Sequence, residues 1–562
     1  MMKDLSAGEY PLRKIFSSDY EFTIPEYQRP YAWGKEQALQ LLDDLEGALA
    51  RDTDEPYFLG SIVLVKAGSD PDAQVIDGQQ RLTTLSILFA VLRDLTENSK
   101  LAGELANVVV EPGEILAGTQ AKPRLSLRKR DKQFFADHVQ NESATKSLVG
   151  LDDAYLKTDA QKAIRDNTVA LRDRIALWSD DKRQRLATML GIRTLLVVVS
   201  TPDLNSAHRI FSVMNARGLD LTPSDIFKSK VIGDVGDVSE HEVSEYADKW
   251  EQEEVDLGRD SFADLFGHVR MIFQKERATK VLLQEFDEQV LSKYLPGKGR
   301  EFVDEVLIPY SDAYEHLLAQ NYPDDVNWSP VNSWLRRLMQ VDNDNWRAPA
   351  LWALKEHGND PAYLAEFLRK LERLAASMLL RRVYATPRGS RYGELLKQLE
   401  KGDGLASGAF DLTAEEVGET RDRLSGRLYL VAPVRKYVLL RLDDLLAKVP
   451  GVSYQHKMIT VEHVLPQNPK DNSLWKQEFT DGERLYWTHR LGNLVLLNRA
   501  KNSQAQNYDF AKKKAKYFTS ANGSAVFALT TQVITEDEWT PAVIEKRQKD
   551  LVALLSKEWE LT

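Results

Sequence analysis

The chain has 562 residues, more than one ordinary hydrophobic core accommodates, and this length predicts two to four domains. Its 43% hydrophobic and 28% charged residues are typical of a soluble globular protein, and the absence of cysteine excludes disulfides and Cys-ligated zinc or iron–sulfur sites. The net charge of −11 argues against a general nucleic-acid coat, although it allows a local basic groove.

The N-terminal residues are polar and lack the apolar region of a secretory signal. No apolar stretch approaches the roughly 20 residues that span a bilayer. We therefore expect a cytoplasmic protein without a membrane partner.

Short strands alternate with helices over the first part of the chain, which predicts an α/β domain. Leucine and other apolar residues recur at helical spacing in some segments, and short apolar runs typical of buried strands lie between them. The expected elements are helices over 38–49, 85–95 and much of 130–190, and strands over 61–65, 73–76 and 195–199.

A helix near 205–216 is followed by one that begins at Thr222-Pro223, with Thr222 as the N-cap. The pattern is then helical to about residue 440, and Pro450-Gly451 suggests a boundary. We expect an α+β multidomain protein. Its predicted parts are an α/β domain over 1–235, a helical middle over 236–440 and a small C-terminal domain over 441–562.

Three segments of the first domain carry unusual motifs. They are I-P-E-Y-Q-R-P-Y-A-W over 24–33, V-I-D-G-Q-Q-R-L-T-T-L over 75–85 and F-S-V-M-N-A-R-G-L-D-L-T over 211–222. The aromatic residues of the first segment are either core residues or part of a pocket.

The Asp77-Gly78 turn joins a predicted strand to a predicted helix, so backbone N–H groups at the helix N-terminus offer an anion site. Gly78 permits close backbone approach, and Arg81 can pair with phosphate oxygens. Asp77 would repel a bare phosphate, so we expect it to act through a bridging metal or an activated water. The residues alone leave a purely connecting turn as the alternative. The Walker A pattern of P-loop NTPases is absent.

The C-terminal part contains K-M-I-T-V-E-H-V-L-P-Q and, further on, H-R-L-G-N-L-V-L-L-N-R-A-K-N with a Lys-rich helix behind it. This order predicts strand, loop, strand and helix, the outline of a ββα-metal finger. His463 suits a general base near pH 7, and Glu462 and Asn502 offer hard oxygen ligands for Mg²⁺ or Mn²⁺. We expect Asn493 to orient the His463 ring through a hydrogen bond.

A basic segment surrounds these residues, with eight Lys or Arg between residues 484 and 516 against one acid. We expect it to contact phosphates through Arg490, Arg499, Lys501 and Lys513. A second basic cluster over 122–132 is either a solvated face or another phosphate contact. His456 and His489 raise the alternative of a three-histidine zinc site, but we interpret both as structural or DNA-facing residues.

The C-terminal constellation resembles the HNH nuclease superfamily, in which an acid–His pair, a middle Asn and a last Asn or His recur in this order. The resemblance covers roughly residues 440–530. Glu462 stands where Asp is commoner, which bears on the geometry of the metal.

The front motifs resemble the ParB/sulfiredoxin-like domain of modification-dependent restriction systems. With the nuclease motif, the chain is similar to fused GmrSD-like type IV restriction endonucleases and to the SspE-like proteins. The resemblance implies binding and hydrolysis of a nucleoside triphosphate by one set of residues, Asp77, Gly78, Gln79, Gln80 and Arg81. It implies a sensor pocket lined by Tyr27, Gln28, Arg29 and Tyr31.

The expected function is therefore that of an anti-phage restriction endonuclease, and the resemblance implies two partners, modified phage DNA and a nucleotide. The helical middle would transmit the signal of the sensor or restrain the nuclease, and it offers a surface for a homo-oligomer. Two alternatives stay open from the sequence: a nucleotide-dependent DNA-binding regulator that does not cleave, and an RNA-cutting toxin.

Overall fold

The computed structural model describes residues 5–51, 55–113, 118, 120–202, 206–207, 223–239, 242–322, 326–447, 459–498, 507–515 and 527–561. The chain divides into two compact units. The first comprises Met1–Trp250 with Pro296–Arg300, and the second comprises Glu251–Leu295 with Glu301–Thr562. No helix in these ranges is both long and apolar enough to cross a membrane.

A six-stranded mixed sheet forms the base of the first unit, in the order β1–β8–β3–β4–β2–β7. The strands are β1 (Ser6–Pro11), β2 (Glu21–Thr23), β3 (Tyr57–Val65), β4 (Asp72–Asp77), β7 (Leu125–Ser126) and β8 (Thr194–Thr201). β3 pairs in parallel with β8 and antiparallel with β4. The strands predicted over 61–65, 73–76 and 195–199 are confirmed as parts of β3, β4 and β8.

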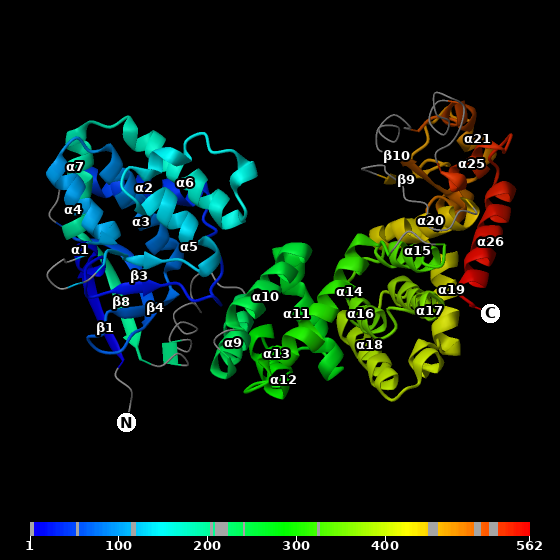
Figure 1. Ribbon diagram of the computed structural model, residues 1–562. Coiled ribbons are helices and arrows are strands. Elements are labelled where there is room, and N and C mark those ends of the chain that lie inside the picture. The colour runs from blue at the N-terminus through cyan, green and yellow to red at the C-terminus, as the bar shows by residue number, and fades with distance from the viewer. Residues whose placement is uncertain are drawn as a thin grey trace. The chain divides into compact units, whose positions relative to one another are not determined.

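One buried helix, α3 (Gln79–Leu95), organises the packing of the first unit. Almost every side chain from Gln79 to Arg93 is buried, as expected for a helix whose apolar residues extend around most of its surface. Three helices pack against it, and α2 (Lys35–Ala50) packs on two of these (Figure 1). They are α4 (Ser99–Val109), α6 (Asp159–Ala176) and α7 (Asp180–Ile192).

The segment Pro296–Arg300 packs against α9 (Pro223–Val238), which is why it belongs to the first unit. The Asp234 carboxylate accepts hydrogen bonds from Gly297 N at 2.7 Å and Gly299 N at 2.8 Å. A Cβ on Gly299 would lie 2.7 Å from the Val231 carbonyl oxygen, so only glycine fits this contact. The helix predicted to begin at Thr222-Pro223 is confirmed from Pro223; Thr222 and the 211–222 motif lie outside the described residues.

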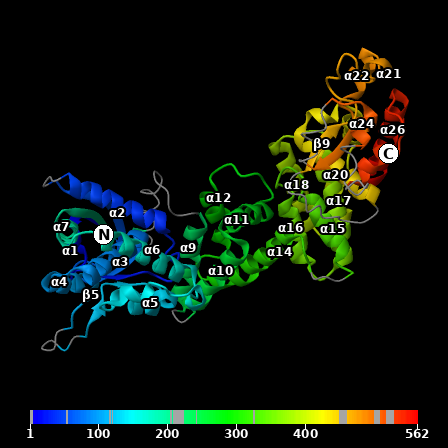
Figure 2. The same ribbon diagram turned by 90° about the horizontal axis from the view of Figure 1, so that it is seen from above.

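Helices dominate the second unit up to residue 447, which confirms the helical pattern predicted for the middle of the chain. Figure 2 shows α11 beside α12 and α14 beside α16. The longer helices are α11 (Arg259–Gln274), α12 (Leu282–Gln289), α14 (Ile308–Ala319), α15 (Ser329–Leu338), α16 (Arg347–Glu356), α17 (Pro361–Leu380), α18 (Ala385–Glu400), α19 (Ala414–Ser425) and α20 (Ala432–Ala447).

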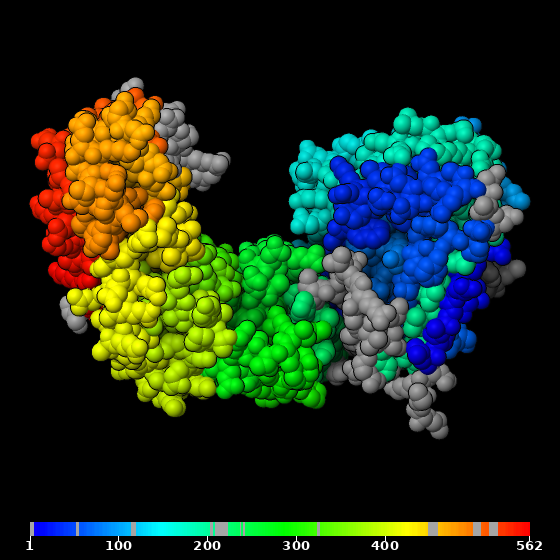
Figure 3. Space-filling model, turned by 180° about the vertical axis from the view of Figure 1, so that it is seen from behind, coloured from blue at the N-terminus to red at the C-terminus, as the bar shows by residue number. Residues whose placement is uncertain are grey.

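The end of the second unit has its own small core around an antiparallel strand pair, β9 (Ile459–His463) and β10 (Leu494–Asn498). Trp475, Trp539 and Phe510 fill this core. Short helices connect and flank the strands: α21 (Trp475–Glu478), α22 (Asp481–Trp487), α24 (Phe510–Lys513) and α25 (Ala528–Ile534). The last helix, α26 (Pro541–Glu558), lies against the orange segment that carries the strands (Figure 3). The predicted order of strand, loop, strand and helix is present.

Candidate functional site

The last two residues of β9 carry the predicted nuclease chemistry. His463 pairs with Leu494 and Glu462 with Val495 in the antiparallel register. Neighbouring residues of a strand point to opposite faces, so these two side chains meet different surroundings.

His463 is held among aromatic and polar side chains and is only 5% exposed. Its Nε2 lies 3.3 Å from His489 Nδ1, and its Nδ1 lies 3.4 Å from Gln467 Nε2. The Tyr429 ring covers it at a centroid distance of 3.9 Å. The site therefore fixes the orientation of the imidazole from three sides.

Burial, supported by His489, Lys513 and Arg435, lowers the pKa of His463 to about 3. A ring with this pKa is neutral at pH 7, but it is a weaker base than the histidine with a pKa near 7 that the sequence predicted. His489, interpreted from the sequence as structural or DNA-facing, contacts this ring directly. His456 lies outside the described residues.

Glu462 forms an ion pair with Lys513, the last residue of α24. Lys513 Nζ lies 3.2 Å from Glu462 Oε1 and donates to the His463 carbonyl oxygen at 2.6 Å. Burial raises the pKa of Glu462, and the Lys513 ammonium opposes that rise. The Lys513 side chain is fully buried, so the prediction that it contacts DNA is wrong for this arrangement. Its charge instead balances the carboxylate beside the base.

Asn493 has a different role from the one predicted. Its amide Oδ1 accepts from Leu465 N at 2.7 Å and from Trp539 Nε1 at 3.2 Å, and its Nδ2 donates to the carbonyl oxygens of Leu465 and Thr488 at 2.9 and 3.0 Å. The expected hydrogen bond to the His463 ring is not formed. Asn493 is a positioning residue that fixes the chain two residues beyond His463.

Arg490 lies half-buried beside Tyr486, with its guanidinium 3.8 Å from the ring centroid. It donates to the Tyr486 carbonyl oxygen at 3.0 Å and to the Ser425 carbonyl oxygen. These bonds give it a structural part in addition to any contact with phosphate. The other predicted DNA contacts, Arg499 and Lys501, and the predicted metal ligand Asn502 lie outside the described residues.

The chemistry of the donor set decides which cation the site fits. Glu462 provides a carboxylate, with a side chain that is 17% exposed. Mg²⁺ binds through one or two carboxylates and keeps several waters, whereas protein-bound zinc needs three or four side-chain ligands. In the part of the chain that the structure describes, no three His, Asp or Glu side chains form a metal cluster. Among the described residues, the predicted ligand set is represented by Glu462 alone, and a single carboxylate is compatible with a hydrated ion such as Mg²⁺ or Mn²⁺ rather than with zinc.

The D-G-Q-Q-R motif spans the end of β4 and the first turn of α3. Gly78 is the N-cap of α3 with φ +93°, and a Cβ there would lie 2.4 Å from Ile62 Cγ2. Both its backbone conformation and its packing therefore require glycine. Asp77 Oδ1 accepts from Gly78 N at 2.8 Å, which holds the turn closed.

The two glutamines of this motif bind the loop that carries the first front motif. Gln79 Nε2 donates to the Arg29 carbonyl oxygen at 2.7 Å. Gln80 Oε1 accepts from Ala32 N and Trp33 N at 2.8 and 3.0 Å, and its Nε2 donates to the Pro30 carbonyl oxygen at 3.0 Å. The structure thus joins two motifs that lie 50 residues apart in the sequence, and the glutamine side chains serve as the clamp.

The predicted sensor residues lie on this clamped loop and are mostly buried. Gln28 donates to the Ile76 carbonyl oxygen at 3.0 Å, and Tyr31 Oη lies 2.9 Å from Thr84 Oγ1. Burial raises the pKa of Tyr31 to about 12 and also raises that of Tyr27. Both tyrosines are therefore protonated core residues, while Gln28 and Arg29 border the same small cavity as the motif.

That cavity measures about 40 Å³, which is room for about one water molecule. A nucleotide would have to bind on the open side of the turn. There, the N–H groups of Gln79 and Gln80 have no acceptor among the described residues, as is usual in the first turn of a helix. Arg81 donates to the Ser61 carbonyl oxygen at 2.9 Å and packs over Gly60, whose φ is +120°.

The basic cluster over 122–132 is not simply a solvated face. Arg124 and Arg128 are 7% and 5% exposed. They pair with Glu111 at 3.1 Å and with Asp131 at 3.2 Å. These two arginines stabilise the first unit from inside.

Two family models match this chain. Residues 12–232 match the model described as GmrSD restriction endonuclease, N-terminal domain, and residues 418–554 match that described as GmrSD restriction endonucleases, C-terminal domain. No curated protein matches the sequence. The first match contains the clamped turn, and the second contains His463, its acidic neighbour and Tyr429.

Proposed function

The chain belongs to the GmrSD restriction endonucleases, and from this premise we propose that its C-terminal part hydrolyses DNA at an HNH-like site around His463. Family membership implies DNA as the substrate. One observation supports this location: a neutral, firmly oriented histidine ends a strand beside a carboxylate, inside the region that matches the C-terminal domain.

His463 acts as the general base in this proposal. If its Nε2–H donates to His489 Nδ1, Nδ1 is the basic atom, and the attacking water would have to take the place of the Gln467 amide that lies 3.4 Å from it. Asn493 supports this indirectly, because it holds the backbone that follows the histidine. Tyr429 covers one face of the ring and limits its rotation.

Glu462 and Asn502 would hold a hydrated Mg²⁺ or Mn²⁺. Such an ion, when bound, stabilises the negative charge that develops on the phosphate and on the departing oxygen. Lys513 lies 3.2 Å from Glu462 and opposes the rise that burial causes in the pKa of that carboxyl, and a metal ion would have to share or replace this contact.

The first unit serves as a nucleotide-dependent sensor in the same proposal. A nucleoside triphosphate would place its phosphates at the N-terminus of α3, where Gly78 allows close approach and the Gln79 and Gln80 N–H groups can donate. The clamp by Gln80 connects this turn to the 29–33 loop, so a ligand at the turn acts directly on that loop. Modified DNA is the class of substrate that we expect the sensor to distinguish.

The deciding experiment compares cleavage of modified and unmodified phage DNA by the full chain, with each of the four ribonucleoside triphosphates and with none. We expect cleavage of modified DNA that depends on one or more nucleotides, and none by His463→Ala. Equal cleavage of both DNAs without nucleotide would refute the sensor. Unchanged cleavage by His463→Ala would refute the nuclease site.

A further inference from the structure

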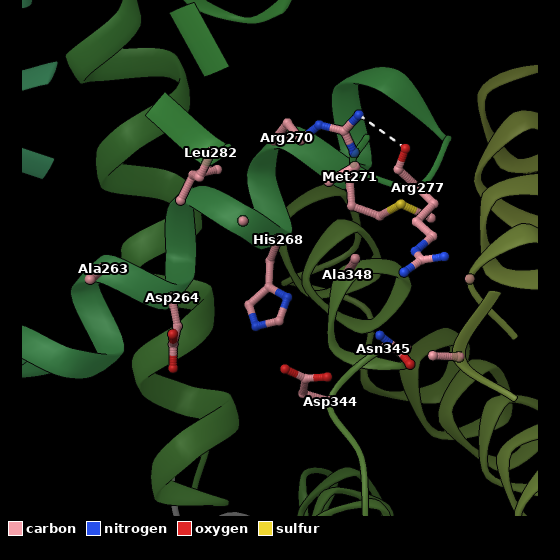
Figure 4. A pocket seen from close by; sticks show the side chains of 14 residues that line it. Ala263, Asp264, His268, Arg270, Met271, Arg277, Leu282, Asp344, Asn345 and Ala348 are labelled. Atoms are coloured by element: carbon pink, nitrogen blue, oxygen red, sulfur yellow. Dashed lines mark hydrogen bonds between the residues drawn. The ribbon is translucent and has the colours of Figure 1, made fainter. Parts of the chain in front are cut away.

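A cavity of about 380 Å³ lies in the helical part of the second unit (Figure 4). It opens to solvent and is lined by α11, the start of α12, the residues around the start of α16 and the start of α18. Small-molecule sites in proteins have volumes of roughly 300–1,000 Å³, so this cavity has the size of a ligand site. Neither family match includes these helices.

Small residues create the open space. Gly267 on α11 and Gly389 on α18 both line the cavity, and a Cβ on either would meet no atom within 4 Å. Ala263, Ala348 and Ala385 extend the same lining. Close packing is the rule in protein interiors, and here the side chains that would supply it are missing from several helices at once.

One buried polar group in the lining lacks a partner. His268 is 9% exposed, and its Nε2 has no hydrogen-bond partner among the described residues. The Tyr314 ring packs edge-on against the imidazole at 5.5 Å. Burial lowers the pKa of His268 to about 4, so the ring is neutral and can donate or accept one hydrogen bond. An unsatisfied buried group of this kind can be bonded by a water molecule or by a ligand atom.

Further hydrogen-bonding groups converge on the same space. Figure 4 shows Asp264, Asp344 and Asn345 around the His268 ring. The Asn345 Oδ1 accepts from Arg388 Nε at 2.6 Å, which directs its amide nitrogen to another partner. The lining therefore combines carboxylate acceptors, an amide donor and a neutral imidazole with the apolar side chains of Met271 and Leu282.

Charges of both signs line the cavity. Asp264, Asp344 and Arg277 are exposed, and Arg277 can attract a phosphate, whereas Arg270 is buried and pairs with Glu285 at 2.7 Å. The segment 381–391, which includes the first turns of α18, has four arginines, of which Arg381 and Arg391 pair with Glu416 at 2.9 and 3.7 Å. Its Tyr384 is 85% exposed and offers a ring for stacking.

We propose that this cavity binds a nucleobase with an exocyclic amino group, cytosine or adenine, with its sugar and phosphate left at the arginine-bearing rim. The carboxylates accept from the amino group, and His268 and Asn345 bond to ring atoms. A carboxylate that accepts from an exocyclic amine is a common mode of base recognition. A metal is a poorer fit, because no three ligating side chains group together in the described residues.

The base can come from a free nucleoside or from DNA. An enzyme that reads a base in duplex DNA can turn it out of the stack into such a pocket. The inference that the base comes from DNA rests on the proposed function. The inference that the pocket binds a base does not.

The test fills the cavity. Gly267→Leu places a side chain in the open space, and Gly418→Leu, on the exposed face of α19, is the matched control because its Cβ also meets nothing within 4 Å. The full chain is assayed in EDTA with two probes: each of the four deoxynucleosides by calorimetry, and a duplex containing one 2-aminopurine, whose fluorescence rises when the base leaves the stack. Thermal melting establishes that each variant folds.

We expect deoxycytidine or deoxyadenosine to bind at least about fivefold more tightly than thymidine, the ratio that one good base contact provides. Gly267→Leu should weaken binding about tenfold or more, and Gly418→Leu should leave it within twofold. A 2-aminopurine signal lost only in Gly267→Leu assigns the pocket to an extruded base. If nucleoside binding is weakened in Gly267→Leu and the 2-aminopurine fluorescence does not rise in the wild type, the pocket is assigned to a free nucleoside.

Asp344→Asn offers a second variant if Gly267→Leu does not fold, and it should reduce the preference for the amino-bearing base to near parity. The pocket is refuted if nucleoside binding and 2-aminopurine fluorescence are the same in the wild type as in folded Gly267→Leu and Asp344→Asn. It is also refuted if the wild type gives neither signal. DNA cleavage is measured separately with Mg²⁺. Absence of cleavage by the wild-type chain would refute the proposed nuclease and leave the pocket result unchanged.

Discussion

Asn493→Ala tests how the nuclease site is held together. The substitution removes four hydrogen bonds made by a fully buried amide. At about 0.5–1.5 kcal/mol each, these bonds amount to about 4 kcal/mol of local stability. Because every 1.4 kcal/mol is tenfold in an equilibrium constant, the Leu465 amide should exchange its hydrogen about a thousandfold faster. The rate of DNA cleavage should fall in the same variant, since Leu465 lies two residues beyond His463.

Hydrogen exchange followed by mass spectrometry on peptides that cover residues 459–467 measures this effect where it occurs. Asn472→Ala is the control, because Asn472 is an exposed residue of the same region and its loss should cost less than about 0.5 kcal/mol. Unchanged protection with lost cleavage would show that Asn493 acts on the reaction itself. Unchanged protection with full cleavage would refute the positioning role.

The remaining predictions concern the two proposed sites. His463→Ala should reduce nicking of plasmid DNA about 10²-fold or more while the melting temperature stays near wild type, and retained nicking would remove it from the mechanism. EDTA should stop cleavage and Mg²⁺ or Mn²⁺ should restore it, with Glu462→Gln raising the metal concentration required; restoration by zinc alone would contradict the oxygen-ligand assignment. Asp77→Ala and Arg81→Ala should abolish phosphate release from nucleoside triphosphates, and wild-type turnover in both would reduce the motif to a structural turn. Gly78→Ala should lower the melting temperature of the first unit, because its Cβ would overlap Ile62, and an unchanged melting curve would contradict the packing argument.

Local periodicity predicted several of the regular elements, but not the short strands β1, β2 and β7. The apolar run at 61–65 lies in β3, and the leucines between 85 and 95 belong to α3, because burial of apolar side chains dictates both patterns. What periodicity does not contain is strand order. The parallel pairing of β3 with β8 joins segments separated by more than 120 residues, and no local pattern specifies it.

At the nuclease site too, contacts between distant parts of the chain could not be predicted from local patterns. Glu462 and His463 are neighbours in sequence, so their place at a strand end was predictable from the motif. Tyr429 comes from a short 3-10 helix more than 30 residues upstream, and only folding brings it onto the ring. Lys513 looked like part of a DNA-binding run because charge in a sequence does not reveal burial, and its partner Glu462 lies 51 residues away.

The return of Pro296–Arg300 to the first unit has a practical consequence for dissecting the protein. The backbone passes between the units at three points, so a protease that nicks the chain once after Trp250 would not release two free halves. The N-terminal fragment would still grip the downstream fragment through Asp234 and the two glycine amides. Conversely, a gene truncated at residue 250 would encode a first unit in which the Asp234 carboxylate lacks the Gly297 and Gly299 amides. Such a fragment should be less stable than the same unit inside the intact chain.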